Sequence, residues 1–127
     1  MNVFELTKTL ISIPSISGDE KNVALFLADH LRAIGFQVEL QDAQADRPNV
    51  YARRGEPDVV LSTHTDTVPP FVEFREDDYF IYGRGACDAK GLIASMIKAG
   101  EAGYPIHHSD KVQETTASFQ KPSYHNP

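Results

Sequence analysis

The sequence predicts an α/β fold, with three helices around a central, mostly parallel sheet that is incomplete. Two observations lead to this prediction. Apolar residues recur at helical spacing in three separate stretches, and short strand-like stretches lie between them. The length of 127 residues and the hydrophobic content of 41% fit one globular domain with a modest core.

Two helices are expected before residue 35. Apolar residues over 3–11 have helical spacing, and Pro14 then breaks the pattern. Ser17 and Glu20 have the spacing of a capping box, in which two side chains satisfy free N–H groups at the start of a helix. The second helix is therefore expected over 23–34, where apolar residues again recur at helical spacing.

Four strands are expected in the middle of the chain. Residues 36–40 alternate between apolar and polar side chains, as a half-buried strand does. Residues 49–53 are expected to form another strand, with the polar residues 41–48 as a loop between the two. Residues 59–62 form a short, mainly apolar run, which is typical of a strand buried on both faces of an α/β sheet. The last of the four strands is expected over 79–82.

A third helix is expected over 89–99, and the pattern is lost after it. Residues 100–127 show no sustained helical or strand spacing. We therefore divide the chain into a patterned part, 1–99, and an unpatterned tail that is disordered or read from a shifted frame. The apolar strand that should follow the third helix is missing, so we expect a truncated front part of a larger domain.

Charge and cysteine content exclude some classes of function. The formal net charge is -6 and the sequence contains no run of lysine or arginine, so binding to nucleic acid is not expected. Cys87 is the only cysteine, so no disulfide can form within the chain, and a reducing, cytoplasmic location is expected. We expect no signal peptide, because residues 1–10 lack a continuous apolar stretch, and no membrane span, because no apolar run in the sequence is long enough.

The first stretch that could carry chemistry is His64-Thr65-Asp66, at the exit of the predicted 59–62 strand. Side chains two positions apart in an extended segment point to the same side, so His64 and Asp66 can be neighbours. A histidine there can ligate a metal ion while a carboxylate orients its ring. The same residues suit a loop histidine beside a capping aspartate, and the spacing alone favours this second interpretation.

The second stretch is the glycine-rich loop 83–91. Asp88 stands just before the third helix, where it could cap the helix or present a carboxylate to a metal ion. Cys87 could supply a thiolate, although a small buried side chain is the simpler interpretation. Arg84 and Lys90 could contact a substrate carboxylate, or serve in packing or at the surface.

Together, the two stretches resemble the M20 family of metallopeptidases and deacylases. Residues 61–69 (LSTHTDTVP) resemble the family's strand-exit motif, 82–91 (YGRGACDAKG) its second motif, and 14–20 (PSISGDE) its N-terminal region. The resemblance covers about residues 3–99. Members include acetylornithine deacetylases, succinyl-diaminopimelate desuccinylases, aminoacylases and carboxypeptidases. The resemblance implies an incomplete three-layer, zinc-peptidase-like catalytic domain that hydrolyses amide bonds in N-acyl amino acids or small peptides.

The resemblance also implies roles for three residues. His64 would ligate one zinc ion, Asp88 would bridge two, and Asp66 would be the residue of the catalytic site that orients His64. Two zinc ions lower the pKa of a bound water and polarise the scissile carbonyl. Cobalt or manganese would suit the same ligands.

The family pattern includes more groups than this sequence provides. It continues with a strand ending in a Glu-Glu pair, which supplies the general base and a ligand. The family pattern also includes a further acidic ligand and a distant histidine. It is completed by a smaller domain, through which full-length relatives often dimerise. Glu101, Glu114 and the tail histidines do not fit the positions of the general base or the further ligands.

We therefore expect the chain to be inactive alone. The alternative is a non-catalytic module or relic that pairs with another chain through an open sheet edge. A nucleotide-binding domain is disfavoured because 83–85 lacks the full glycine-rich phosphate fingerprint.

Overall fold

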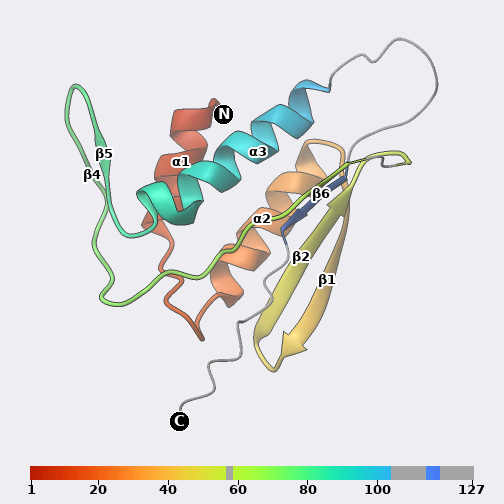
Figure 1. Cartoon of the computed structure of the whole chain (residues 1–127), viewed down its shortest axis with the longest axis horizontal. Helices are drawn as coiled ribbons and strands as arrows, with labels where there is room; N and C mark the ends of the chain where they lie inside the picture. The colour runs from red at the N-terminus through yellow and green to blue at the C-terminus, as the bar shows by residue number, and fades with distance from the viewer. Residues whose placement is uncertain (57–58, 104–113, 118–127) are drawn as a thin grey trace.

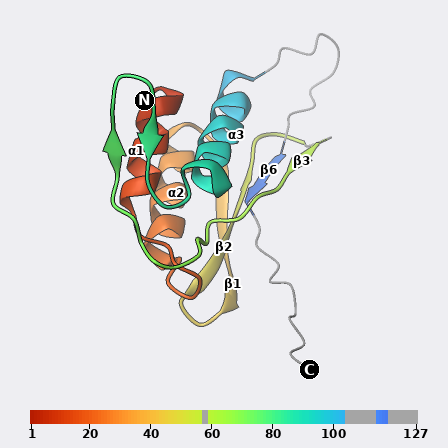
Figure 2. The ribbon, with the colours of Figure 1, turned by 60° about the vertical axis from the view of Figure 1, so that its left-hand side comes forward.

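The computed structural model describes residues 1–56, 59–103 and 114–117, the last four by their backbone alone. Helices α1 (Val3–Ser12), α2 (Lys21–Ala33) and α3 (Gly91–Ala102) lie on one side of a sheet (Figure 1). The strand order of this sheet is β1-β2-β6-β3. Its strands are β1 (Gln37–Gln44), β2 (Arg47–Arg53), β3 (Val60–Leu61) and β6 (Glu114–Ala117). A separate hairpin of β4 (Arg75–Glu76) and β5 (Ile81–Tyr82) projects beside α1 (Figure 2).

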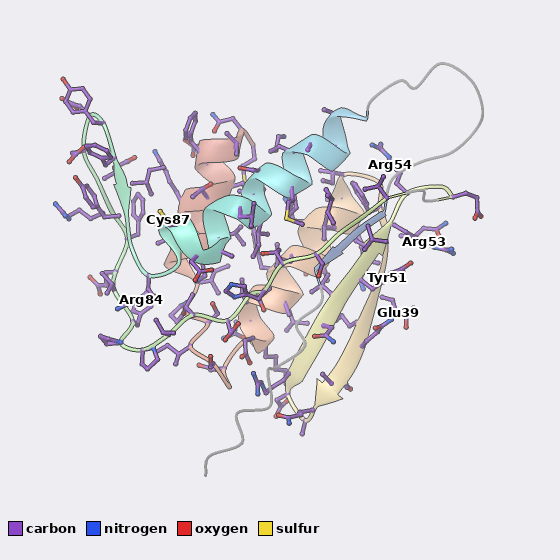
Figure 3. The ribbon with its side chains drawn as sticks, viewed as in Figure 1. Glu39, Tyr51, Arg53, Arg54, Arg84 and Cys87 are labelled. Atoms are coloured by element: carbon purple, nitrogen blue, oxygen red, sulfur yellow. The ribbon has the colours of Figure 1, made fainter. Side chains whose placement is uncertain are left out.

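The core lies between the three helices and the face of the sheet that they cover. Each helix turns one apolar side inward, and β2 contributes its alternate residues Val50 and Ala52. The opposite face of the sheet carries Glu39, Tyr51 and Arg53, which point away from α2 (Figure 3). The buried cluster consists of Leu6, Leu10, Val23, Ala24, Leu27, Leu31, Phe36, Val50, Ala52, Ile93, Ala94 and Ile97. In the described ranges no helix has the length and apolar character to cross a bilayer.

The α/β class is confirmed, but the mostly parallel sheet is not. Strands β1 and β2 are consecutive and are joined by the two-residue turn Ala45-Asp46, so they pair antiparallel. Asp46 has φ 59, a left-handed conformation that aspartate tolerates in tight turns. Strand β2 also pairs antiparallel with β6, whereas β3 pairs parallel with β6. The described sheet is therefore mixed.

Four predicted segments differ from the structure. The strand predicted over 79–82 is limited to Ile81–Tyr82 and pairs with β4 in the separate hairpin. Residues 41–48, predicted as a loop, continue the hairpin, because its register extends to Gln44 opposite Arg47. The strand predicted as buried on both faces is open: Val60 is 58% exposed, because β3 lies at the edge of the described sheet. In the predicted tail, residues 114–117 form the strand β6. Their sequence, ETTA, contains no apolar run and so did not predict a strand.

The division of the chain at residue 99 stays a prediction. Residues 104–113 and 118–127 lie outside the described part of the chain. Most of the predicted unpatterned tail therefore lies outside the described residues.

Helix α2 begins at Lys21 without the predicted capping box. Glu20 occupies the N-cap, and its carboxylate accepts a hydrogen bond from the backbone N–H of Gly18 at 2.8 Å. Arg47 donates to the same carboxylate from Nε at 2.9 Å and from Nη2 at 2.6 Å. The Glu20 side chain is 6% exposed. This bidentate pair therefore ties the start of α2 to the β1–β2 hairpin.

We expect Glu20→Gln to lower the free energy of unfolding by about 1–3 kcal/mol near neutral pH, because Arg47 loses its buried partner. Burial alone would raise the pKa of the Glu20 carboxyl, but hydrogen bonds from Arg47 and Gly18 outweigh burial and hold that pKa below its ordinary value. The stabilisation is therefore full above the ordinary glutamate pKa and is lost as the pH falls through the lowered pKa.

Urea unfolding between about pH 7 and pH 3 checks this prediction, because the parent chain and Glu20→Gln should converge in acid. The matched control is Asp29→Asn, which breaks the exposed pair with Arg32 on α2 and should change stability little. A stability difference that stays constant down to the lowest pH contradicts the assignment.

Candidate active site

His64 follows the end of β3 and lies between two carboxylates. Its Nδ1 atom is 3.0 Å from Oδ1 of Asp66 and 3.0 Å from the carbonyl oxygen of the same residue. Its Nε2 atom is 2.7 Å from Oδ1 of Asp88. The structure thus brings together the three residues that the motifs predict as a site, from stretches 24 positions apart.

The two carboxylates differ in their surroundings. The side chain of Asp66 is 14% exposed, whereas that of Asp88 is 85% exposed. Burial of the His64 ring disfavours its charged form, but the hydrogen bonds and charges of Asp88 and Asp66 outweigh burial, so the pKa of His64 is raised. An incoming cation would therefore meet the open side of the trio, where Asp88 and Nε2 of His64 lie.

The donor chemistry of His64 and Asp88 fits a zinc ion. Zinc binds histidine nitrogen and carboxylate oxygen at about 2.0–2.2 Å, which places two ligand atoms of a tetrahedral site about 3.3 Å apart. The pair, now 2.7 Å apart, would need to separate by only about 0.6 Å, and Asp88 is at the surface. Asp66 on Nδ1 is the outer partner that a metal-bound histidine ordinarily has. Among the described residues, no group of three or more His, Cys, Asp and Glu side chains is placed to hold a metal.

A short N-terminal segment holds the His64–Asp66 stretch in place. The buried hydroxyl of Ser15 donates to the carbonyl oxygen of Thr65 at 2.7 Å. The N–H of Thr67 donates to the carbonyl of Ser15 at 2.8 Å, and the N–H of Ser17 to the carbonyl of Thr67 at 3.0 Å. The hydroxyl of Ser17 donates to Oδ2 of Asp66 at 2.5 Å. The prediction that Ser17 caps a helix is therefore wrong.

Asp88 lies in the tight turn Ala86–Lys90 that precedes α3. The cap of α3 is Lys90, so the structure does not place Asp88 as the capping residue. Lys90 is 1% exposed, burial lowers its pKa to about 8, and its Nζ donates to the carbonyl oxygen of Ile13 at 2.5 Å. Of the roles considered for Lys90, the structure supports packing. Ile13 precedes Ser15 and Ser17, so the same segment contacts both stretches that carry the site.

An open pocket of about 600 Å³ adjoins Asp66 and Asp88. Its walls come from the β4–β5 hairpin and the glycine-rich loop, and both acidic and basic side chains line it. Arg84 is fixed at this wall because its Nε donates to the carbonyl oxygen of Pro70 at 2.8 Å. Cys87, predicted as a small buried side chain, is exposed instead, in the turn Ala86–Lys90 before α3 (Figure 3).

Similarity to known proteins identifies the family. Residues 60–110, which include both motif stretches, match the family model described as Peptidase family M20/M25/M40. A peptidase M20 domain-containing protein of Schizosaccharomyces pombe is 42% identical over 104 residues, a match that covers 77% of this chain and 26% of that protein. The chain belongs to the M20 peptidase family. The M20 chain spans about a quarter of the length of this curated relative.

Solved structures agree with the fold of the M20 chain. A tripeptidase from Staphylococcus aureus has a TM-score of 0.70 at 20% identity, over 91% of this chain and 35% of that chain. An aminoacylhistidine dipeptidase from Vibrio alginolyticus has a TM-score of 0.68 at 19% identity, over 96% of this chain and 28% of that chain. The mixed α/β architecture of the M20 chain is therefore that of a part of these larger peptidases.

Sequence patterns did not identify Ser15 and Ser17 as partners of the site. Their hydrogen bonds reach 50 and 49 residues along the chain. A contact at that distance leaves no spacing signal, and a serine just before a helix is more typical of a cap. The signal that could have pointed to these serines was the similarity of residues 14–20 to the family's N-terminal region. That similarity marks the segment as part of the family pattern but does not indicate which residues it contacts.

Proposed function

We propose that the M20 chain contributes part of a metal-dependent site that hydrolyses amide bonds in N-acyl amino acids or small peptides. The observation that carries the proposal is the ring of His64, held by Asp66 at Nδ1 and directed at the exposed carboxylate of Asp88 at Nε2. Membership of a peptidase family supports hydrolysis as the reaction. The fold likeness to a tripeptidase and a dipeptidase is in keeping with short peptides as substrates.

Each of the three residues would have a distinct task in this site. Asp66 would orient the ring of His64, and His64 and Asp88 would hold the metal, with Asp88 shared between two ions as the family resemblance implies. Zinc supplies a more acidic bound water and a polarised carbonyl, and cobalt or manganese suits the same donors. We assign the general base and the remaining ligands to other parts of the longer family proteins, as the family resemblance implies.

We expect the purified chain to bind Co²⁺ and Zn²⁺, and His64→Ala and Asp88→Asn each to weaken the affinity by at least about tenfold, because each change removes a donor. Visible absorption during a Co²⁺ titration, followed by competition with Zn²⁺, measures the affinities. Asp29→Asn is the matched control: it neutralises another exposed carboxylate, on α2, and should bind cobalt as the parent does. Parent-like affinity in His64→Ala would reject the site.

The same samples test whether the chain acts alone. We expect no release of amino acids from N-acetyl amino acids or dipeptides above a zinc-only blank, because groups that act together lose most of the catalysis when some are absent. Robust turnover that disappears in His64→Ala would place a general base within these 127 residues and overturn the assignment above.

A second candidate function is a non-catalytic interaction module. The observation in its favour is the open edge of the described sheet at β3, where Val59 and Val60 are 45% and 58% exposed. Size-exclusion chromatography with and without zinc separates the two proposals. A discrete oligomer favours the module, and a soluble aggregate favours a part of an enzyme. In either case we propose a cytoplasmic location, in keeping with the exposed thiol of Cys87.

A further inference from the structure

We propose that Ser17 is a positioning residue of this site and acts on His64 through Asp66. The proposal rests on the metal-binding function proposed above. The hydroxyl of Ser17 lies 2.5 Å from Oδ2 of Asp66, and Oδ1 of the same carboxylate lies 3.0 Å from Nδ1 of His64. One carboxylate therefore connects the N-terminal segment to the histidine ring.

The second contact matters because the carboxylate of Asp66 turns about a soft torsion. Rotation of an aspartate carboxylate about χ2 has a broad, shallow energy profile. A contact to His64 alone would leave that rotation largely free, whereas contacts at both oxygens fix the plane of the carboxylate. The ring of His64 is then fixed as well, with Nε2 toward Asp88.

The expected size of the effect follows from this chain of contacts. Removing the outer partner of a metal-bound histidine costs about 10–100-fold in metal affinity. Ser17 is one contact further from the ion than Asp66, so the loss of its hydroxyl should cost less. We expect a loss of about threefold to tenfold.

Backbone contacts hold Ser17 in place whether or not its hydroxyl is present. Its N–H donates to the carbonyl of Thr67, and the N–H of Thr67 donates to the carbonyl of Ser15. Ser17 is exposed, so truncation of its side chain opens no cavity. A change in metal affinity in Ser17→Ala can therefore be assigned to the lost hydroxyl rather than to unfolding.

Cobalt affinity of the full chain tests the proposal. We expect Ser17→Ala to bind Co²⁺ about threefold to tenfold more weakly, and Ser17→Thr, which keeps a hydroxyl, to restore the parent affinity. Ser12→Ala is the matched control: its hydroxyl donates to the carbonyl of Lys8 within α1, and its loss should leave cobalt affinity unchanged. In an Asp66→Asn background, Ser17→Ala should add no further loss. The proposal is overturned if Ser17→Ala binds Co²⁺ as tightly as the parent chain. It is also overturned if Ser17→Ala weakens cobalt affinity by the same factor in the Asp66→Asn background as in the parent chain.

Side-chain ¹⁵N–¹H NMR of the metal-free chain distinguishes failure of this inference from failure of the proposed function. If the parent chain binds no Co²⁺, the metal-binding function fails, and the resonances of the His64 ring still report on Ser17. We expect Ser17→Ala to shift the ring nitrogen resonances of His64 and Ser12→Ala to leave them in place. Unshifted His64 resonances in Ser17→Ala overturn the positioning role.

Discussion

Alanine at Gly83 is expected to destabilise the M20 chain by about 2–5 kcal/mol, the sum of an overpacking cost and a backbone cost. A Cβ atom at this position would lie 2.2 Å from Cγ2 of Ile11, which is fully buried. Gly83 also has φ 153, a conformation that L side chains rarely adopt. Because Ile11 belongs to α1, the clash would separate the first helix from the glycine-rich loop that leads to Asp88.

Gly18→Ala is the control that isolates the clash. Gly18 also has a positive φ, 105, but a Cβ there would meet no atom within 4 Å. Its replacement should carry the conformational cost alone, about 1–2 kcal/mol. Urea unfolding of both variants measures the two costs. Equal losses at Gly83 and Gly18 would contradict the close packing against Ile11.

Alanine at Gly91 is expected to lower both the stability of the chain and its affinity for cobalt, although alanine favours helices. Helix propensity alone would stabilise the variant by about 1 kcal/mol. A Cβ at Gly91 would, however, lie 2.5 Å from the carbonyl oxygen of Ala86, a backbone atom that cannot rotate away. The turn Ala86–Lys90 must then shift, and Asp88 lies within it. We expect a net loss of about 1–3 kcal/mol and a cobalt affinity lowered by about tenfold.

Urea unfolding and cobalt titration measure the two effects of Gly91→Ala, with circular dichroism to establish that the titrated sample is folded. Ser95→Ala, at an exposed position on the same helix, leaves the turn intact and should raise stability slightly with no change in cobalt affinity. A Gly91→Ala chain that is more stable and binds cobalt as the parent does would show that the turn can adapt.

The helices were the part of the fold that the sequence predicted well, because each one buries a periodic apolar side in a single core. The β1–β2 hairpin was only half predicted. Residues 41–44 (QDAQ) are mostly polar and are exposed on both faces, so they carry no clear alternation, and Ala45-Asp46 is not a strong turn signal. The exposure of Val60 could not be predicted, because an apolar run does not reveal whether its strand lies at the centre or the edge of a sheet.

The motifs predicted the placement of His64, Asp66 and Asp88 together, but not what surrounds them. Ser17 was assigned to a helix cap because capping spacing is local, whereas its partner lies 49 residues away. For Lys90 the sequence left substrate contact, packing and a surface position open, and the structure buries it against the carbonyl of Ile13. Burial of a lysine depends on the neighbours that the fold supplies, and a spacing pattern contains no information about them.

The hydrogen bond from Ser15 to Thr65 has a consequence for the order in which the chain folds. During synthesis from the N-terminus, α1, α2 and the β1–β2 hairpin are complete before Thr65 is added. Closing the 50-residue separation between Ser15 and Thr65, and then the 77-residue separation between Ile13 and Lys90, costs more chain entropy than forming those local elements. We therefore expect His64 and Asp88 to meet late, after their scaffold exists. An ion that needs both residues would bind the finished chain and not its precursors, and at a hundredfold excess over Kd it would stabilise that state by about 2.7 kcal/mol.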